Sequence, residues 1–264
     1  MKETRGRSIP LSAPRKWMGD LAALSRSIPI AALEHRLCLK PLIEVRDRLP
    51  KPHPSWVALF LKAFALVARH RPQLRRGYFN FPWPRLYEHP ISVAAITAEL
   101  EWKGEPAVFF DLLPRPEEMS VMEIHRHLRG LKCEPVTGNP CFRLLLLTEH
   151  VPLPVRRLVW RWLYSFSGPR RAHYLGTFAI NGATRTPIRP VTTTGAIGTT
   201  LYFGRFDPDG STDVCLAFDH RVMDGGEVVR MLDELEAVLN TDLVLELNAL
   251  RTSSPHAATG QRAH

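Results

Sequence analysis

Residues 56–69, with the sequence WVALFLKAFALVAR, constrain the fold most strongly, because a helix of this sequence is apolar on most of its sides. Such a helix requires other layers of the protein to cover it. Ser55 is suited to cap its first turn, and Pro72 disfavours a helical conformation at the residue before it. Lys62 interrupts the apolar run, which is shorter than the roughly 18 residues of a membrane-spanning helix. We therefore expect a buried helix within a globular domain.

The rest of the chain alternates between helical and strand-like patterns, as α/β or α+β domains do. Its 264 residues suffice to bury a core without disulfides or metals. Asp207-Pro-Asp-Gly210 is a strong turn sequence and predicts a hairpin whose second strand contains a buried Cys215. Residues 78–90, rich in aromatics and prolines, are expected to be irregular. The predicted strands are 28–39, 91–100, 106–112, 176–182, 200–206 and 212–218, and the predicted helices are 14–27, 41–48, 120–131 and 224–239.

The charge balance favours anionic partners, since 35 Lys and Arg residues face 26 Asp and Glu residues, a formal net charge of +9. Nucleic acid, anionic lipid, phosphorylated cofactors and acidic carrier proteins all fit such a surface, and so does an ordinary basic enzyme. No recognised nucleic-acid motif is present, so we expect no nucleic-acid partner. The opening residues 1–10 are polar and basic and lack a secretory h-region, which predicts a cytoplasmic location.

Metal binding is not expected. The four cysteines are scattered without a C-x-x-C pair, which argues against a zinc ribbon or a disulfide framework. His125 and His127 are two residues apart on a predicted helix and so point to different faces. The cysteines are Cys38, Cys133, Cys141 and Cys215.

The segment FDHRVMDGG at 218–226 contains the most informative chemistry in the chain. His220 follows a predicted strand, where an imidazole can project into a cleft with a pKa near the pH that a general base needs. Asp224 precedes the next helix, whose exposed amides favour a carboxylate. Gly225 and Gly226 permit close approach of backbone or ligand. Taken alone, the pattern fits a structural histidine at a turn about as well as a catalytic one.

The wider string resembles the D-H-R-x-x-D-G motif of the catalytic domain of dihydrolipoamide acyltransferases, the core subunits of 2-oxo acid dehydrogenase complexes. Residues 9–16, IPLSAPRK, resemble the family's opening P-L-S-x-x-R-K, and residues 27–29, SIP, its T-I-P. Residues 176–180, GTFAI, resemble the G-T-F-T-I strand. These collinear matches cover roughly residues 8–240. The chloramphenicol acetyltransferases share the fold and the His-x-x-x-Asp-Gly motif.

The resemblance implies a two-layer α/β sandwich with a mixed sheet and helices packed on one side. It also implies a homotrimer, or a larger cubic assembly, with active sites at subunit interfaces. In the family, the motif histidine, here His220, is the general base, and the motif aspartate, here Asp224, pairs with an arginine that supports the site together with the following glycine, here Gly225. Arg15 is the candidate for that arginine, the alternative being a solvated helix arginine. The family's oxyanion-donating serine is replaced by Asn181, whose amide can also donate, and Thr184 is another candidate donor.

Two departures from the family affect the expected function. Residues 142–171 form a longer connection than the family's, and the lipoyl and subunit-binding domains have no counterpart. We predict a single acyltransferase domain at 8–248, flanked by a tail at 1–7 and a disordered tail at 249–264. The substrates would be coenzyme A thioesters or a lipoyl group on another protein, with a thiol or hydroxyl acceptor and no metal. The alternative is a non-catalytic trimeric or cage-forming scaffold.

Within the atypical connection, residues 154–167 form an amphipathic basic helix, PVRRLVWRWLYSFS. Leu158, Trp162 and Phe166 share one stripe, while Arg156, Arg157 and Arg161 lie elsewhere on the helix. Such a helix most often packs on its own domain or on a neighbouring subunit. A basic amphipathic helix can also lie on a membrane surface or bind a partner.

Overall fold

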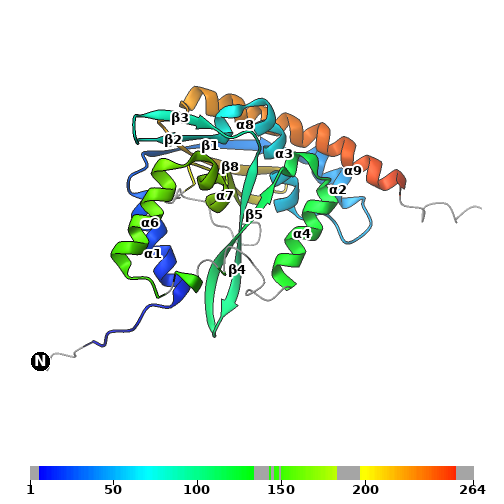
Figure 1. Cartoon of the computed structure of the whole chain (residues 1–264). Coiled ribbons are helices and arrows are strands. Elements are labelled where there is room, and N and C mark those ends of the chain that lie inside the picture. The colour runs from blue at the N-terminus through cyan, green and yellow to red at the C-terminus, as the bar shows by residue number, and fades with distance from the viewer. Residues whose placement is uncertain (1–5, 134–142, 144–145, 149, 183–196, 254–264) are drawn as a thin grey trace, which may run out of the picture.

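The computed structural model describes residues 6–133, 143, 146–148, 150–182 and 197–253. Six strands form one mixed sheet in the order β1-β8-β7-β6-β4-β5, and β2 and β3 form a separate hairpin (Figure 1). The strands of the large sheet are β1 (Ile30–Cys38), β4 (Val93–Trp102), β5 (Glu105–Pro114), β6 (Phe178–Gly182), β7 (Thr199–Phe206) and β8 (Ser211–Asp219); those of the hairpin are β2 (Arg76–Phe79) and β3 (Arg85–Glu88). The helices are α1 (Ala13–Ser25), α2 (Lys40–Asp47), α3 (Trp56–His70), α4 (Val121–Cys133), α6 (Leu153–Phe166), α7 (Gly168–Leu175), α8 (Gly225–Asn240) and α9 (Asp242–Ser253).

The sheet is mixed because β6 runs parallel to both of its neighbours, β4 and β7, while the other pairs are antiparallel. The predicted turn joins β7 to β8: the Gly210 N–H donates to the Asp207 carbonyl at 2.9 Å, and Gly210 has a φ of +85°. That positive φ accounts for a glycine at this position. After this turn the chain runs antiparallel to β7 as strand β8, whose last residue is Asp219.

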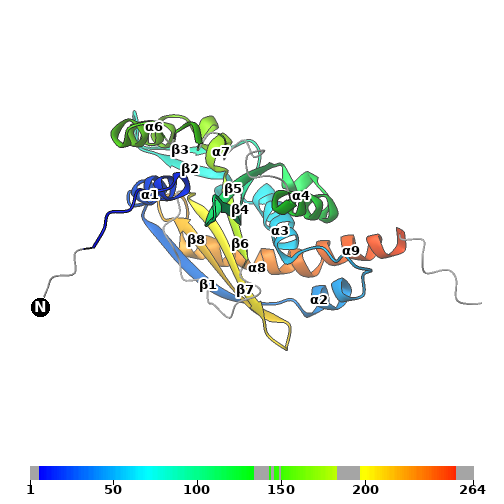
Figure 2. The ribbon, with the colours of Figure 1, turned by 90° about the horizontal axis from the view of Figure 1, so that it is seen from below.

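One face of the sheet is covered by α3, α4, α8 and α9, and the main core lies between them (Figure 2). As its sequence predicts, α3 is almost entirely buried, and the Ser55 hydroxyl accepts a hydrogen bond from Ala58 N–H at 3.3 Å. Phe60 stacks on Phe203 of β7 with 4.0 Å between ring centroids. The Lys62 ammonium leaves this core by donating to the carbonyls of Glu117 and Met119 at 2.7 and 2.6 Å.

Among the described elements, α1 and α6 pack on the other face of the sheet, where they lie side by side (Figure 2). Trp17 and Leu21 of α1 and Trp160 and Tyr164 of α6 pack there against small side chains such as Ala95. The predicted one-sided helical layer is therefore the main layer, and a second, smaller one lies opposite. The fold class is the predicted two-layer α/β arrangement.

Helix α6 does not pack on the protein through the apolar stripe that its sequence indicates. Leu158, Trp162 and Phe166 are exposed, whereas Trp160 and Tyr164 are buried. Arg156, expected away from the packed side, is buried and pairs with the buried Asp20 of α1. An ion pair with an acidic residue far away in the sequence thus fixes the orientation of this helix.

Two further expectations differ from the structure. Residues 78–90 are not wholly irregular, because β2 and β3 pair there and the Phe79 side chain is buried. Helix α9 continues to Ser253, past the predicted domain end at 248, because Leu243 and Leu247 are buried in the main core. Residues 254–264 lie outside the described part of the chain. Among the described helices, none combines the length and the apolar character needed to cross a bilayer.

Candidate active site

His220 lies directly after β8, at the point where the sheet ends. Its backbone N–H donates to the Pro29 carbonyl at 3.0 Å, so the residue preceding β1 fixes its backbone. The side chain is 55% exposed, and its Nδ1 lies 3.4 Å from Asp224 Oδ1. Among the described residues, Nε2 has no hydrogen-bond partner.

Asp224 is the N-cap residue of α8, as the sequence predicts. The Glu227 carboxylate accepts a hydrogen bond from the Asp224 N–H at 3.2 Å, and the Gln73 amide donates to the same carboxylate at 3.1 Å. Gly225 opens the helix, and a Cβ atom there would meet only Leu33, at an ordinary 3.9 Å. The helix start thus holds a carboxylate beside the imidazole.

The residues on either side of His220 form a rigid clamp. Asp219 is fully buried, and its carboxylate accepts two hydrogen bonds from the Arg221 guanidinium, at 2.9 and 2.7 Å, and a third from the Arg221 N–H at 3.0 Å. This carboxylate raises the pKa of Arg221. The guanidinium also lies over the Tyr78 ring, 4.3 Å from its centroid. A bidentate pair of this kind fixes both position and angle, so the backbone of His220 is held from both sides.

Side chains of the family-atypical connection reach this clamp. Arg171 of α7 is buried, donates to the Tyr78 carbonyl at 3.1 Å, and lies 3.9 Å from the ring centroid of Tyr164 of α6. Burial raises the pKa of Tyr164, whose hydroxyl has no hydrogen-bond partner among the described residues. Sequence reasoning did not identify Arg171, because nothing in the pattern of a short basic helix distinguishes a buried arginine from an exposed one.

Asn181 lies on β6, on the sheet face opposite the main core. Its Oδ1 accepts a hydrogen bond from the Thr97 hydroxyl at 2.5 Å. That contact assigns the amide oxygen as the acceptor, so the amide nitrogen has its donors directed elsewhere. Thr184, the other candidate donor, lies outside the described residues.

Asn181 and His220 do not meet within one chain. The register aligns Asn181 with Tyr202 of β7 and Tyr202 with Cys215 of β8. His220 therefore lies two strands away and five residues further along. At about 4.8 Å between strands and about 3.3 Å per residue, their Cα atoms are separated by about 20 Å. One chain cannot direct both side chains at the same reacting atom.

Arg15 is not brought to Asp224 either. Its guanidinium lies 2.9 Å from Glu105 of β5, and both side chains are largely exposed. Hydrogen bonds from Ser12 and Arg15 lower the pKa of Glu105. In this chain Arg15 therefore joins α1 to β5, and the direct neighbours of Asp224 are His220 and the α8 residue Glu227.

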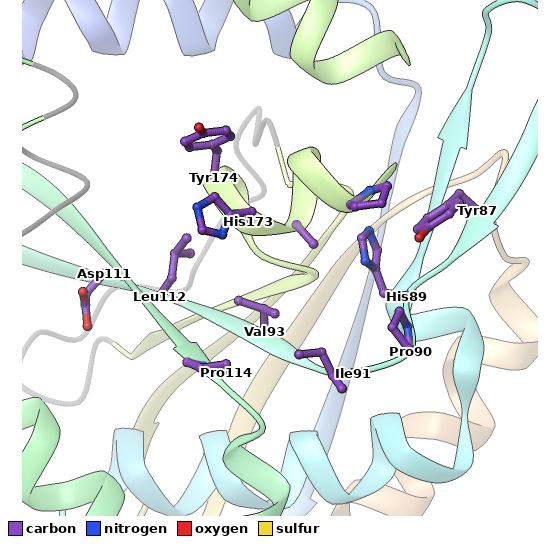
Figure 3. A pocket seen from close by; sticks show the side chains of 12 residues that line it. Tyr87, His89, Pro90, Ile91, Val93, Asp111, Leu112, Pro114, His173 and Tyr174 are labelled. Atoms are coloured by element: carbon purple, nitrogen blue, oxygen red, sulfur yellow. The ribbon is translucent and has the colours of Figure 1, made fainter. Parts of the chain in front are cut away.

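A cavity of 660 Å³ lies elsewhere, between the hairpin, α7 and the edge strand β5. Figure 3 shows His89 and Tyr87 on one side of it and Asp111 on the other. Burial, together with the positive charge of Arg171, lowers the pKa of His89 to about 4. Neither His220 nor Asn181 is among the residues that line this cavity. Its lining is Tyr87, His89, Pro90, Ile91, Val93, Asp111, Leu112, Pro114, Pro169, Ala172, His173 and Tyr174.

The described part of the chain contains no cluster of three or more His, Cys, Asp or Glu side chains arranged to hold a metal ion. Cys215 is buried in β8, as expected, and burial raises the pKa of its thiol. Cys38 and Cys133 are free and exposed, and Cys141 lies outside the described residues.

Comparison with known proteins shows the class of fold. The sequence matches no protein-family profile. It also matches no curated protein. Solved structures do match: the fold is that of acyltransferase cores, with the mixed sheet and helical layer described above. All of these likenesses are below 25% identity, so they are likenesses of fold.

Among the particular structures, a probable dihydrolipoamide acetyltransferase from Listeria monocytogenes is 16% identical, with a TM-score of 0.62, over 94% of this chain and 97% of that one. The cubic core of a pyruvate dehydrogenase multienzyme complex is 13% identical, with a TM-score of 0.66, over 92% and 96% of the two chains. A chloramphenicol acetyltransferase is 12% identical, with a TM-score of 0.51, over 87% and 98%. The predicted resemblance to the acyltransferase core fold is thereby confirmed.

Proposed function

We propose that the protein is an acyltransferase that moves an acyl group from a thioester to a thiol or hydroxyl acceptor, with His220 as general base. The observation that carries the proposal is the placement of His220: an exposed imidazole whose neighbours Asp219 and Arg221 are locked together. The fold shared with acyltransferase cores supports it. A buried structural histidine would have both ring nitrogens satisfied, whereas Nε2 here has no partner among the described residues.

The proposed reaction uses two groups, the Nε2 atom of His220 and the side-chain amide of Asn181. His220 Nε2 accepts the proton of the acceptor thiol or hydroxyl, and the resulting sulfur or oxygen nucleophile attacks the thioester carbonyl. The tetrahedral intermediate has an oxyanion, to which the Asn181 amide donates. When the intermediate collapses, the carbon–sulfur bond breaks and the leaving thiolate takes the proton back from His220. Asp224 stabilises the imidazolium while it holds that proton.

The separation of about 20 Å between His220 and Asn181 requires two copies of the chain for this chemistry. His220 of one copy and Asn181 of the next would face the same carbonyl across a subunit boundary. We propose a closed ring, with a homotrimer as its simplest form. The cubic core among the similar structures supports self-association of this kind.

The proposed donor is a coenzyme A thioester or a lipoyl thioester carried by another protein. The formal charge of +9 suits both a phosphorylated cofactor and an acidic carrier protein. No metal takes part in the proposed steps, since the base, the oxyanion donor and the supporting carboxylate are all side chains of this chain.

The first test is the His220→Ala variant, measured by chromatographic separation of coenzyme A from acetyl-CoA with dihydrolipoamide as acceptor. Loss of the base should lower the rate about 10²–10⁴-fold. His173→Ala, which removes an exposed histidine on α7, is the matched control and should retain activity. Equal activity of the His220→Ala and unaltered proteins would refute His220 as the base, and no turnover by the unaltered protein across acyl-CoA donors would support the non-catalytic scaffold instead.

The second test asks whether the site is shared between copies. His220→Ala and Asn181→Ala chains, each impaired alone, are co-expressed with different affinity tags and purified through both. If each site takes its base from one chain and its oxyanion donor from the next, every mixed trimer that carries both tags has both intact residues at one of its three sites, so about a third of the sites are complete. Recovery of activity toward that level is expected. Mixed assemblies no more active than the separate variants would exclude a site built from these two residues across an interface.

A further inference from the structure

The outward side of α6 and the tip of the β2–β3 hairpin together form an exposed aromatic surface. On α6 this surface consists of large apolar side chains on one side of the helix, and Trp83 on the hairpin is 70% exposed. Phe81 of the hairpin meets Phe166 of α6 at 4.3 Å between ring centroids, so the two segments form one surface. We call this the aromatic surface, and its members are Phe81, Trp83, Val155, Leu158, Val159, Trp162 and Phe166.

The exposure of this surface is not the result of a loosely attached helix. The opposite side of α6 is anchored by the buried Trp160 and Tyr164 and by the ion pair between Arg156 and Asp20. Both views of the ribbon place α6 at the outside of the molecule, against α1 and the hairpin (Figures 1 and 2). The apolar residues of the aromatic surface therefore lie on the outer side of a helix whose inner side is packed on the protein.

The surroundings of the aromatic surface are positively charged. The exposed arginines of α6 and α7 are Arg157, Arg161 and Arg170, and residues 150–182 contain no aspartate or glutamate. Arg161 is exposed and adjacent to Trp162 on α6, and the Arg170 guanidinium lies 4.8 Å from the ring centroid of Trp162, whereas Arg157 lies 3.8 Å from the buried Asp20. Arg85, at the hairpin, donates to the Trp83 carbonyl at 3.5 Å. A partner for this surface must accept apolar side chains and supply negative charge around them.

We infer that the aromatic surface docks on an anionic phospholipid membrane. A bilayer interface takes up Leu, Val, Trp and Phe side chains to a depth of about 5–10 Å, while its phosphate groups attract arginines at the rim. Tryptophan is favoured at this boundary because its ring is apolar and its N–H is polar. A second copy docked symmetrically, through the same surface, would instead bring two arginine-rich rims together, which like charge disfavours; a contact with a different surface of the next copy in a ring is an outcome of the test below. The inference is independent of the proposed acyl transfer.

The test is co-sedimentation of the full chain with vesicles of phosphatidylcholine containing phosphatidylglycerol, compared with phosphatidylcholine alone. Binding is expected to the anionic vesicles, to weaken as salt is raised, and to be absent or slight with neutral vesicles. Leu158→Ser should lower the partition coefficient about tenfold, because a leucine side chain loses its burial. Leu245→Ser on α9 is the matched control, since Leu245 is 68% exposed and Leu158 is 67% exposed, and it should bind like the unaltered protein.

The electrostatic part is tested separately with Arg161→Gln, compared with Arg129→Gln on α4. Arg161→Gln should weaken binding to anionic vesicles several-fold, because Arg161 lies on the helix that carries the aromatic surface. Arg129→Gln should not weaken it, because Arg129 lies on α4. Failure of the unaltered protein to bind anionic vesicles at low salt overturns the inference. So does equal binding by Leu158→Ser and Leu245→Ser. If Leu158→Ser changes the oligomeric state in analytical ultracentrifugation while vesicle binding is absent, the surface is an interface between copies and not a membrane site.

Discussion

The two faces of the sheet are covered by layers of different chemical character. On the α3 face, Phe60 and Phe64 pack among other apolar side chains, and the single ammonium of Lys62 is led out to two backbone carbonyls. On the α6 face, aromatic side chains such as Trp160 and Tyr164 pack beside buried charged groups. These groups are the Asp20–Arg156 pair and Arg171. An apolar core tolerates the exchange of one apolar side chain for another of similar volume. A buried ion, in contrast, destabilises the protein when its oppositely charged partner is removed.

This difference also separates stability from function. The clamp around His220 connects to the α6 face through Tyr78 and Arg171, whereas the α3 face contributes mainly the apolar side of α8. We therefore expect substitutions on the α3 face to act mainly through the free energy of unfolding. For substitutions on the α6 face, the change in the free energy of unfolding should also depend on the charge of the new side chain and on the pH of the solution.

The largest expected effect is on the α3 face. Phe60→Ala removes a fully buried ring that stacks on Phe203, so the free energy of unfolding should fall by about 3–5 kcal/mol, measured by urea denaturation. Leu245→Ala, at an exposed position of α9, should change it by less than about 0.5 kcal/mol. A loss below about 1 kcal/mol for Phe60→Ala would contradict the description of this face as a closely packed core.

On the α6 face, the matching substitution is Arg156→Ala, after which Arg157, at 3.8 Å, is the remaining cationic partner of the buried Asp20 carboxylate among the described residues. Removing one partner of a buried pair costs about 3 kcal/mol or slightly more, because the remaining charge loses its compensation. The double variant Asp20→Leu, Arg156→Met removes both charges and should recover most of that loss. Urea denaturation of the three proteins tests this. A double variant as unstable as Arg156→Ala would show that packing, and not charge, holds α6 in place.

The parts of the fold that the sequence predicts are those where one local pattern has one outcome. Residues 56–69 are apolar all round and are buried, and Asp207–Gly210 forms the expected turn. The motif at 218–226 places His220 at the end of a strand and Asp224 at the start of a helix, as the structure has them. These features depend on neighbouring residues in the chain, so periodicity and turn chemistry suffice.

The features that remained unpredicted depend on distant partners. Helix α6 has large apolar residues on two opposite sides, so its pattern could not indicate which side is buried; Asp20, 136 positions earlier, decides it. The strands β2 and β3 have four residues each, too few for a clear alternation. The contact of Arg15 with Glu105 and the approach of Arg171 to Tyr78 likewise join segments about 90 residues apart in the sequence. The sequence therefore predicted where the motif residues lie in the fold, but it did not predict the contacts around them.

The smallest expected effect is a pH dependence on the α6 face. Burial and the charge of Arg171 lower the pKa of His89 from 6.5 to about 4, so the folded protein keeps this histidine neutral where the unfolded chain protonates it. Its contribution to stability is therefore complete above pH 6.5 and is lost as the pH falls toward 4. Between pH 7 and pH 5 the loss amounts to about 2 kcal/mol. Burial also lowers the pKa of His125, which acts in the same direction, so only a comparison with a variant isolates His89.

The variant for that comparison is His89→Gln, whose amide can still donate to the Gly168 carbonyl that the histidine ring contacts. Urea denaturation of both proteins at pH 7 and pH 5 gives the difference directly: the unaltered protein should lose about 2 kcal/mol more than the variant. Equal losses would mean that His89 is protonated without cost in the folded protein. The α6 face would then be as insensitive to acid as an apolar core, and the contrast between the two faces would rest on the Asp20–Arg156 pair alone.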